Sequence, residues 1–187
     1  AGEAAQLTCQ AHDFAQVYVG DTYVGNINRM KGQTGIMLPK RDKEETLRIV
    51  VDTFGHGNFC SYMEKDRKGI IGPVTLGGST LNQWELRVNP LTAVPQVVPG
   101  KPQGTALGGV FKAEVELQEV ADTFLDMAAW PKGYVWVNGH LLGRYWNIGP
   151  QERLYCPASF LKQGKNEIVV LDFFADVANP PSISGKH

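Results

Sequence analysis

The chain has 187 residues and a formal net charge of -1, from 18 Lys and Arg against 19 Asp and Glu. This length leaves room for one ordinary domain or two small ones, and it excludes a complete (β/α)8 barrel, which needs about 250 residues. The balanced charge provides no large basic surface, so neither nucleic acid nor anionic lipid is expected as a partner. No apolar run approaches the roughly 20 residues of a membrane span.

Short apolar runs rich in β-branched and aromatic residues, separated by Gly, Pro, Asn and Asp, predict an all-β protein. In chain order, clear examples of the expected strands cover residues 15–19, 47–51, 84–88, 110–120, 134–137 and 168–174. Only residues 157–161, with Pro at the start and Gly164 beyond the end, predict one short helical turn.

Two dipeptides predict tight hairpin turns. Gly20-Asp21 and Asn138-Gly139 each separate two apolar runs, and Asn-Gly is a preferred pair for a turn with positive φ. The two hairpins resemble each other at a spacing of 118, from position 17 to position 135. The strand at 49–51 matches that at 168–170 with a spacing of 119, from position 49 to position 168. This repeat predicts two related antiparallel β-sandwich units.

The composition between the two copies predicts a linker. We expect a first unit over residues 1–94, a linker over 95–109 and a second unit over 110–187. Proline removes donors from a strand ladder and glycine weakens strand order, so the Pro- and Gly-rich stretch favours an extended crossing. The tail over 179–187, which contains Pro180-Pro181, is expected to be loose.

Motifs for metals and nucleophiles are missing from the sequence. Cys9, Cys60 and Cys156 show no C-x-x-C spacing, which leaves three buried thiols or a single Cys9–Cys60 bridge as the alternatives. The four histidines are far apart, so no metal site and no cofactor are expected, although structural calcium held by backbone carbonyls stays open. Asp122 and Asp126 are close only in sequence, and we interpret them as turn residues rather than a catalytic carboxylate pair.

Aromatic, amide and basic side chains gather between residues 130 and 155. Flat rings can stack on the C–H face of a sugar, and Arg and Asn can donate hydrogen bonds to its hydroxyls. Alternation places Val135 and Val137 on one face of a strand and Tyr134 and Trp136 on the other, and either face could be core. The candidate carbohydrate-binding residues are Trp136, Asn138, His140, Arg144, Tyr145 and Trp146.

These residues carry a resemblance to a known family. The stretch WPKGYVWVNG at 130–139, LGRYW at 142–146 and IGPQ at 148–151 resembles the C-terminal β-domains of family 35 glycoside hydrolases, the β-galactosidases. The first half is similar to the same family at 12–19 and at 66–70, DRKGI. One departure is FGHGNFC at 54–60, where the family more often has Arg after the first Gly and Gly at the end. The contacts of that Arg are therefore not carried over to this chain.

The resemblance implies two sandwiches of the jelly-roll, galactose-binding-domain-like type, the first lacking its usual first strand or strands. In the family, both catalytic glutamates lie in a (β/α)8 barrel. No residue here matches either glutamate, so this chain alone is not expected to be an enzyme.

The implied role is a non-catalytic carbohydrate-binding or accessory module that recognises galactosides or related polysaccharide. The alternatives are structural domains that buttress a catalytic barrel, or a processed fragment of an active β-galactosidase. Carbohydrate and such a barrel are the implied partners, and the resemblance favours an extracellular, periplasmic or lysosomal location over the cytoplasm.

Overall fold

The computed structural model describes residues 2–59, 61–96, 107–176 and 178–186. These residues form β-strands and three short 3-10 turns, which confirms the all-β prediction. Within this part of the chain, no helix has the length and apolar character that a membrane crossing requires. The chain divides into two compact units, one ending at Arg87 and the other taking in residues 88–96 and the chain from Leu107 onward. Most of the expected linker lies outside the described residues, so the predicted boundaries stay a prediction.

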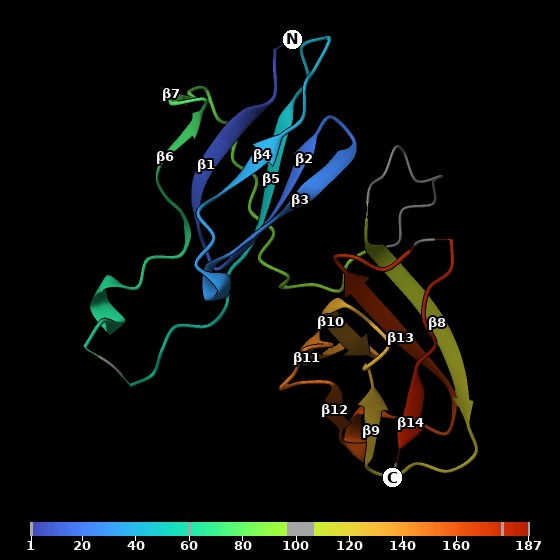
Figure 1. Ribbon diagram of the computed structural model, residues 1–187. Coiled ribbons are helices and arrows are strands. Elements are labelled where there is room, and N and C mark those ends of the chain that lie inside the picture. The colour runs from blue at the N-terminus through green and yellow to red at the C-terminus, as the bar shows by residue number, and fades with distance from the viewer. Residues whose placement is uncertain (1, 60, 97–106, 177, 187) are drawn as a thin grey trace. The chain divides into compact units, whose positions relative to one another are not determined.

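The first unit is a sandwich of two antiparallel sheets (Figure 1), with strand orders β4-β1-β6-β7 and β3-β2-β5. Its core contains Leu7, Val17, Ile27 and Leu38, which come from both sheets. The elements are β1 (Ala5–His12), β2 (Phe14–Val19), β3 (Thr22–Asn28), η1 (Arg29–Lys31), β4 (Gly35–Leu38), β5 (Leu47–Asp52), η2 (Met63–Lys65), β6 (Gly69–Leu76) and β7 (Ser79–Thr80).

The second unit also packs two antiparallel sheets, with orders β11-β10-β13-β8 and β12-β9-β14. Val135, Val137 and Val170 of the first sheet meet Leu125 and Leu154 of the second in one core. The elements are β8 (Gly109–Leu117), β9 (Thr123–Asp126), β10 (Lys132–Val137), β11 (His140–Trp146), β12 (Arg153–Cys156), η3 (Ala158–Phe160), β13 (Gly164–Asp172) and β14 (Ser184–Lys186).

The internal repeat appears as two hairpins with the same irregularity. Val17 pairs with Gly25 and Val135 pairs with Gly143, and in both hairpins the register shifts at the next residue. Gly25 and Gly143 have φ of 154° and 142°, values at which glycine is favoured, and a β-bulge at this place twists each hairpin alike. One detail of the sequence match is wrong, because Val19 pairs with Leu47 whereas Val137 pairs with Ile168. Leu47, not Ile49, is therefore the equivalent of Ile168.

The predicted strand at 84–88 does not form. These residues make no ladder, and the side chains of Leu86 and Val88 are 85% and 75% exposed. The alternation of apolar and polar residues is typical of a strand with one apolar face. A strand also needs a neighbouring strand to pair with its backbone N–H and C=O groups. The expected helical turn is present as η3, and β8 ends at Leu117 rather than continuing to residue 120.

A charged network fixes the base of the loop between β5 and β6. The buried Asp13 carboxylate lies 2.9 Å from the Arg29 guanidinium and 2.8 Å from the Lys68 ammonium. Both cations also contact Asp66, at 3.0 and 3.1 Å. His56, which stands where the family more often has Arg, places its Nδ1 3.3 Å from an Asp66 oxygen. His56 thus adjoins the same network of charges.

Burial by itself would raise the pKa of Asp13, but hydrogen bonds from Lys68, Arg29 and the Phe54 amide outweigh it and hold the pKa below its usual value. Cys9 and Cys156 are free, buried thiols, and burial raises the pKa of Cys9 to about 11. Cys60 lies outside the described residues, so the alternative Cys9–Cys60 bridge is not placed.

Candidate functional site

The outer face of the sheet β11-β10-β13-β8 carries the polar and aromatic side chains that the sequence singled out. Residues paired across neighbouring strands share a face. Lys112 pairs with Val169, Val169 with Trp136, and Trp136 with Leu141, so one row crosses all four strands. Val135 and Val137 lie in the core. This decides which face of β10 is internal: Tyr134 and Trp136 belong to the outer face.

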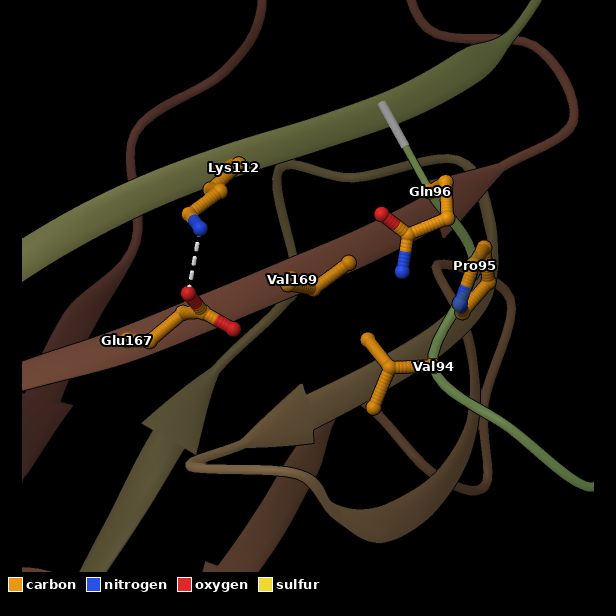
Figure 2. Close-up of a pocket in the computed structure, with 6 residues that line it drawn as sticks. All are labelled: Val94, Pro95, Gln96, Lys112, Glu167 and Val169. Carbon is orange, nitrogen blue, oxygen red and sulfur yellow. Dashed lines mark ion pairs between the residues drawn. The ribbon is translucent and has the colours of Figure 1, made fainter. Parts of the chain in front are cut away.

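A pocket of about 270 Å³ lies on this face, between β8, β13 and residues 94–96 (Figure 2). In Figure 2, the ammonium of Lys112 is directed at the carboxylate of Glu167, with which it forms an ion pair. The side-chain amide of Gln96 lies beside Val169. The hydrogen bond with Glu167 raises the pKa of Lys112. The pocket therefore offers a cation, a carboxylate and an amide around an apolar floor. Its volume is slightly below that of typical ligand pockets, which run from about 300 to 1,000 Å³.

Arg144 and Tyr134 form the next row on the same face. The Arg144 Nη2 donates to the Tyr134 hydroxyl at 2.6 Å, and its guanidinium carbon lies 5.2 Å from the centre of the tyrosine ring. Trp136 is only 2% exposed, and its ring centre is 6.3 Å from that of Tyr134. A ring this covered offers no open face to a ligand, whereas Arg144 is half-buried.

Trp146 takes part in a cation–aromatic contact. The fully buried Lys132 places its ammonium 5.0 Å from the Trp146 ring centre and 4.9 Å from that of Phe173. Such contacts stabilise a desolvated cation by about 2 kcal/mol or more. One face of Trp146 is therefore committed to Lys132.

Asn138 and His140 are positioned by the turn between β10 and β11. Asn138 adopts φ of 47°, followed by Gly139 at 87°, as the predicted tight turn requires. The Asn138 amide donates to the Phe160 carbonyl at 2.7 Å and to Asn166 Oδ1 at 2.8 Å, and its oxygen accepts from the Glu167 amide at 2.9 Å. His140 stacks on Phe160 with ring centres 4.2 Å apart. Asn138 thus fastens the hairpin to β13.

Tyr145 does not fit its predicted place in a binding face. Its side chain is 0% exposed, and its hydroxyl donates to Asp172 Oδ2 at 2.7 Å. Burial, together with the Asp172 charge, raises the pKa of Tyr145 far above its usual value. The physical reason is alternation along β11, which places Tyr145 on the opposite face from Arg144 and Trp146. The six predicted residues therefore separate into an outer-face set (Trp136, Arg144, Trp146), a turn pair (Asn138, His140) and one core residue (Tyr145).

The pocket residues Gln96, Lys112 and Glu167 were not among the predicted site residues. Lys112 and Glu167 are ordinary polar positions in alternating strands, and their meeting depends on the β8–β13 register. Residues 94–96 carried no signal beyond the proline-rich composition. Within the described residues, no group of three or more His, Cys, Asp or Glu side chains is arranged to hold a metal ion.

Both units match domains of one protein family. Residues 3–92 match the family described as the first all-beta domain of beta-galactosidase, and residues 109–166 match the family described as its galactose-binding domain. The chain is 34% identical to the human beta-galactosidase-1-like protein 3, covering 89% of this chain and 26% of that protein. It is 34% identical to a beta-galactosidase of Xanthomonas manihotis, over 76% of this chain and 24% of the relative. The chain thus spans about a quarter of the length of these curated relatives.

Proposed function

Because this chain belongs to the β-galactosidase family, as its first all-beta and galactose-binding domains, we propose that it is a non-catalytic module that binds galactosides or related polysaccharide. The observation that carries the proposal is the galactose-binding match over residues 109–166. That match covers β8, with Lys112, and the whole β10–β11 hairpin, which contribute to the outer face, and it ends just before Glu167 and Val169 of β13.

The chemistry of the outer-face pocket supports a sugar as the ligand. Val94 and Pro95 offer apolar surface to the C–H face of one ring, while Lys112, Glu167 and Gln96 present donors and acceptors for its hydroxyls. Arg144 and Trp146 lie on the same face and would serve a longer ligand. A shallow site with few contacts offsets little of the lost freedom of the ligand, so we expect affinity in the millimolar range.

Titration of the chain with methyl β-D-galactoside, followed by amide chemical shifts, tests this proposal. We expect shifts at residues of β8 and β13 around the pocket, and at least a fivefold loss of affinity in Lys112→Met. Lys165→Met is the matched control, because Lys165 is an exposed lysine of β13 that pairs with Glu114 outside the pocket. Absence of any shift with galactosides at ~50 mM would overturn the proposal.

A second role, support of a catalytic barrel, is favoured by one specific observation. Trp136 and Tyr145, two of the aromatic residues suited to stacking, are covered in this structure. Under this role, the chain adds stability to the domain that performs catalysis and binds no sugar by itself. The same titration separates the two roles, because only the first gives saturable shifts.

A further inference from the structure

An apolar groove of about 800 Å³ runs between the two sheets of the second unit. Its floor is the inner face of β8 and β13, and its far wall includes Trp130 and Cys156. Residues 180–183 and β14 cover part of it. The apolar side chains that line it include Phe111, Ala113, Val115, Leu117, Ile168 and Val170.

The groove lies where the inward side chains of β8 are less covered than those of β13. Val170 of β13 pairs with Phe111 and Ile168 with Ala113, so these residues of both strands face inward. On β13 the inward side chains are buried, Val170 at 2% exposure, whereas Val115 of β8 is 38% exposed. The facing sheet has three strands against four. Phe111, near the start of β8, still packs against the core and Trp130, so the groove is open chiefly toward Val115.

The same strand has an open backbone edge. β8 pairs with β13 along all of its residues, and its other edge has no partner strand among the described residues. In a strand, alternate N–H and C=O groups point to each side, so this edge presents a row of donors and acceptors. The covering segment contains Pro180 and Pro181, which have no N–H to pair with it.

We propose that an extended segment from another part of a β-galactosidase-length polypeptide lies along β8 as a fifth strand and closes this groove. Such a segment satisfies two features at once: its backbone pairs with the open edge, and its inward side chains cover the apolar floor. A small apolar ligand would fill the groove but leave the edge unpaired. The relatives supply the length, since this chain spans only about a quarter of them.

Charge specifies the segment further. The outward side chains of β8 include Lys112, Glu114 and Glu116, and on β13 Lys165 lies 3.7 Å from Glu114. Opposite charges across strands are favourable and like charges are not. The incoming strand therefore carries apolar residues at every second position, and Lys or Arg at outward positions beside Glu114 and Glu116. β8 has nine residues, so about nine are needed to match it.

Selection of random nonapeptides displayed on phage against the intact chain tests the proposal. We expect enriched peptides with apolar–polar alternation and basic residues at polar positions. Their synthetic versions should slow hydrogen exchange at every second amide of β8. No enrichment, enriched peptides without alternation, or unchanged exchange at β8 would each overturn the proposal. Binding of the dye 1-anilinonaphthalene-8-sulfonate without any peptide binding would also overturn it, in favour of a small apolar ligand.

Val115→Glu places a charge on the groove floor and should weaken the selected peptides at least tenfold. Val50→Glu is the matched control, because Val50 of β5 is equally 38% exposed but lies in the other unit. Hydrogen exchange is read on the unaltered chain, so the proposal stays testable if Val115→Glu fails to fold. Galactoside binding is read at the outer face, so the failure of either proposal leaves the other standing.

Discussion

Two tyrosine–carboxylate hydrogen bonds of equal length allow a sharp prediction about burial. The Tyr145 hydroxyl donates to Asp172 and the Tyr155 hydroxyl to Asp122, each at 2.7 Å. Tyr145 and Asp172 are almost fully buried, whereas Tyr155 is 50% exposed. Hydrogen bonds to charged groups contribute about 1.5–3 kcal/mol. Because water replaces the lost partner only at the surface, Tyr145→Phe should cost about 1.5–3 kcal/mol and Tyr155→Phe at most about 0.5 kcal/mol.

Urea unfolding followed by tryptophan fluorescence measures the difference. Three of the four tryptophans, Trp130, Trp136 and Trp146, lie in the second unit, so the signal reports on it. We expect a lower midpoint for Tyr145→Phe with an unchanged slope. Galactoside binding should persist in both variants. Equal losses of stability in the two variants would refute the reasoning, and loss of galactoside binding without loss of stability in Tyr145→Phe would place Tyr145 in the binding site after all.

Four further substitutions test other parts of the structure. Gly25→Ala should destabilise the fold by about 1–3 kcal/mol, and by more than Gly143→Ala. The added Cβ would lie 2.5 Å from a side-chain carbon of Ile36 at the first position, but 3.7 Å from one of Leu154 at the second. Thermal melting of both variants checks this order. Because the folded-state pKa of Asp13 is lowered, its contribution to stability is present above about pH 4 and lost as the pH falls through the folded value. Asp13→Asn should therefore flatten the acid limb of a stability–pH curve, and an unchanged limb would contradict the network's role. Asn138→Ala removes three hydrogen bonds of 2.7 to 2.9 Å and should cost about 2–3 kcal/mol in urea unfolding, while a loss below about 0.5 kcal/mol would show that the turn holds without them.

Local sequence signals were enough for the all-β class, the two hairpins and their repeat, but not for strands such as β1, β6 and β9. Asn138-Gly139 requires positive φ at two successive residues, and few other structures satisfy that requirement together with apolar runs on both sides. The strand at 84–88 failed because alternation describes a face but supplies no partner edge. The same limit explains the two-residue error in matching Ile49 to Ile168, since either register leaves the same face internal.

Alternation along the strands could group the predicted site residues by face, and whether any of them binds carbohydrate stays a prediction. A period of two separates Tyr145 from Arg144 and Trp146 but does not say which set is internal. Tyr145 was predicted to contact the ligand because an aromatic ring with a hydroxyl suits a sugar. In the structure its hydroxyl instead donates to the buried carboxylate of Asp172, 27 positions later in the chain. The pocket partner Glu167 was likewise out of reach, because Lys112 meets it only through the β8–β13 register.

The two faces of one strand now carry separate proposals, and this separation follows from how β8 sits in its sheet. Its outward residue Lys112 closes a small polar pocket with Glu167, while its inward residues Val115 and Leu117 line an apolar groove. An internal strand would have had both faces and both edges fixed by neighbours. As an edge strand, β8 leaves polar groups available on one side and backbone and apolar groups available on the other. A strand added along its open edge would therefore restrict the motion of β8 and of the Lys112 side chain. If both proposals hold, the selected nonapeptides should strengthen galactoside binding. Galactoside should then strengthen peptide binding by the same factor, because coupling between two binding sites is reciprocal.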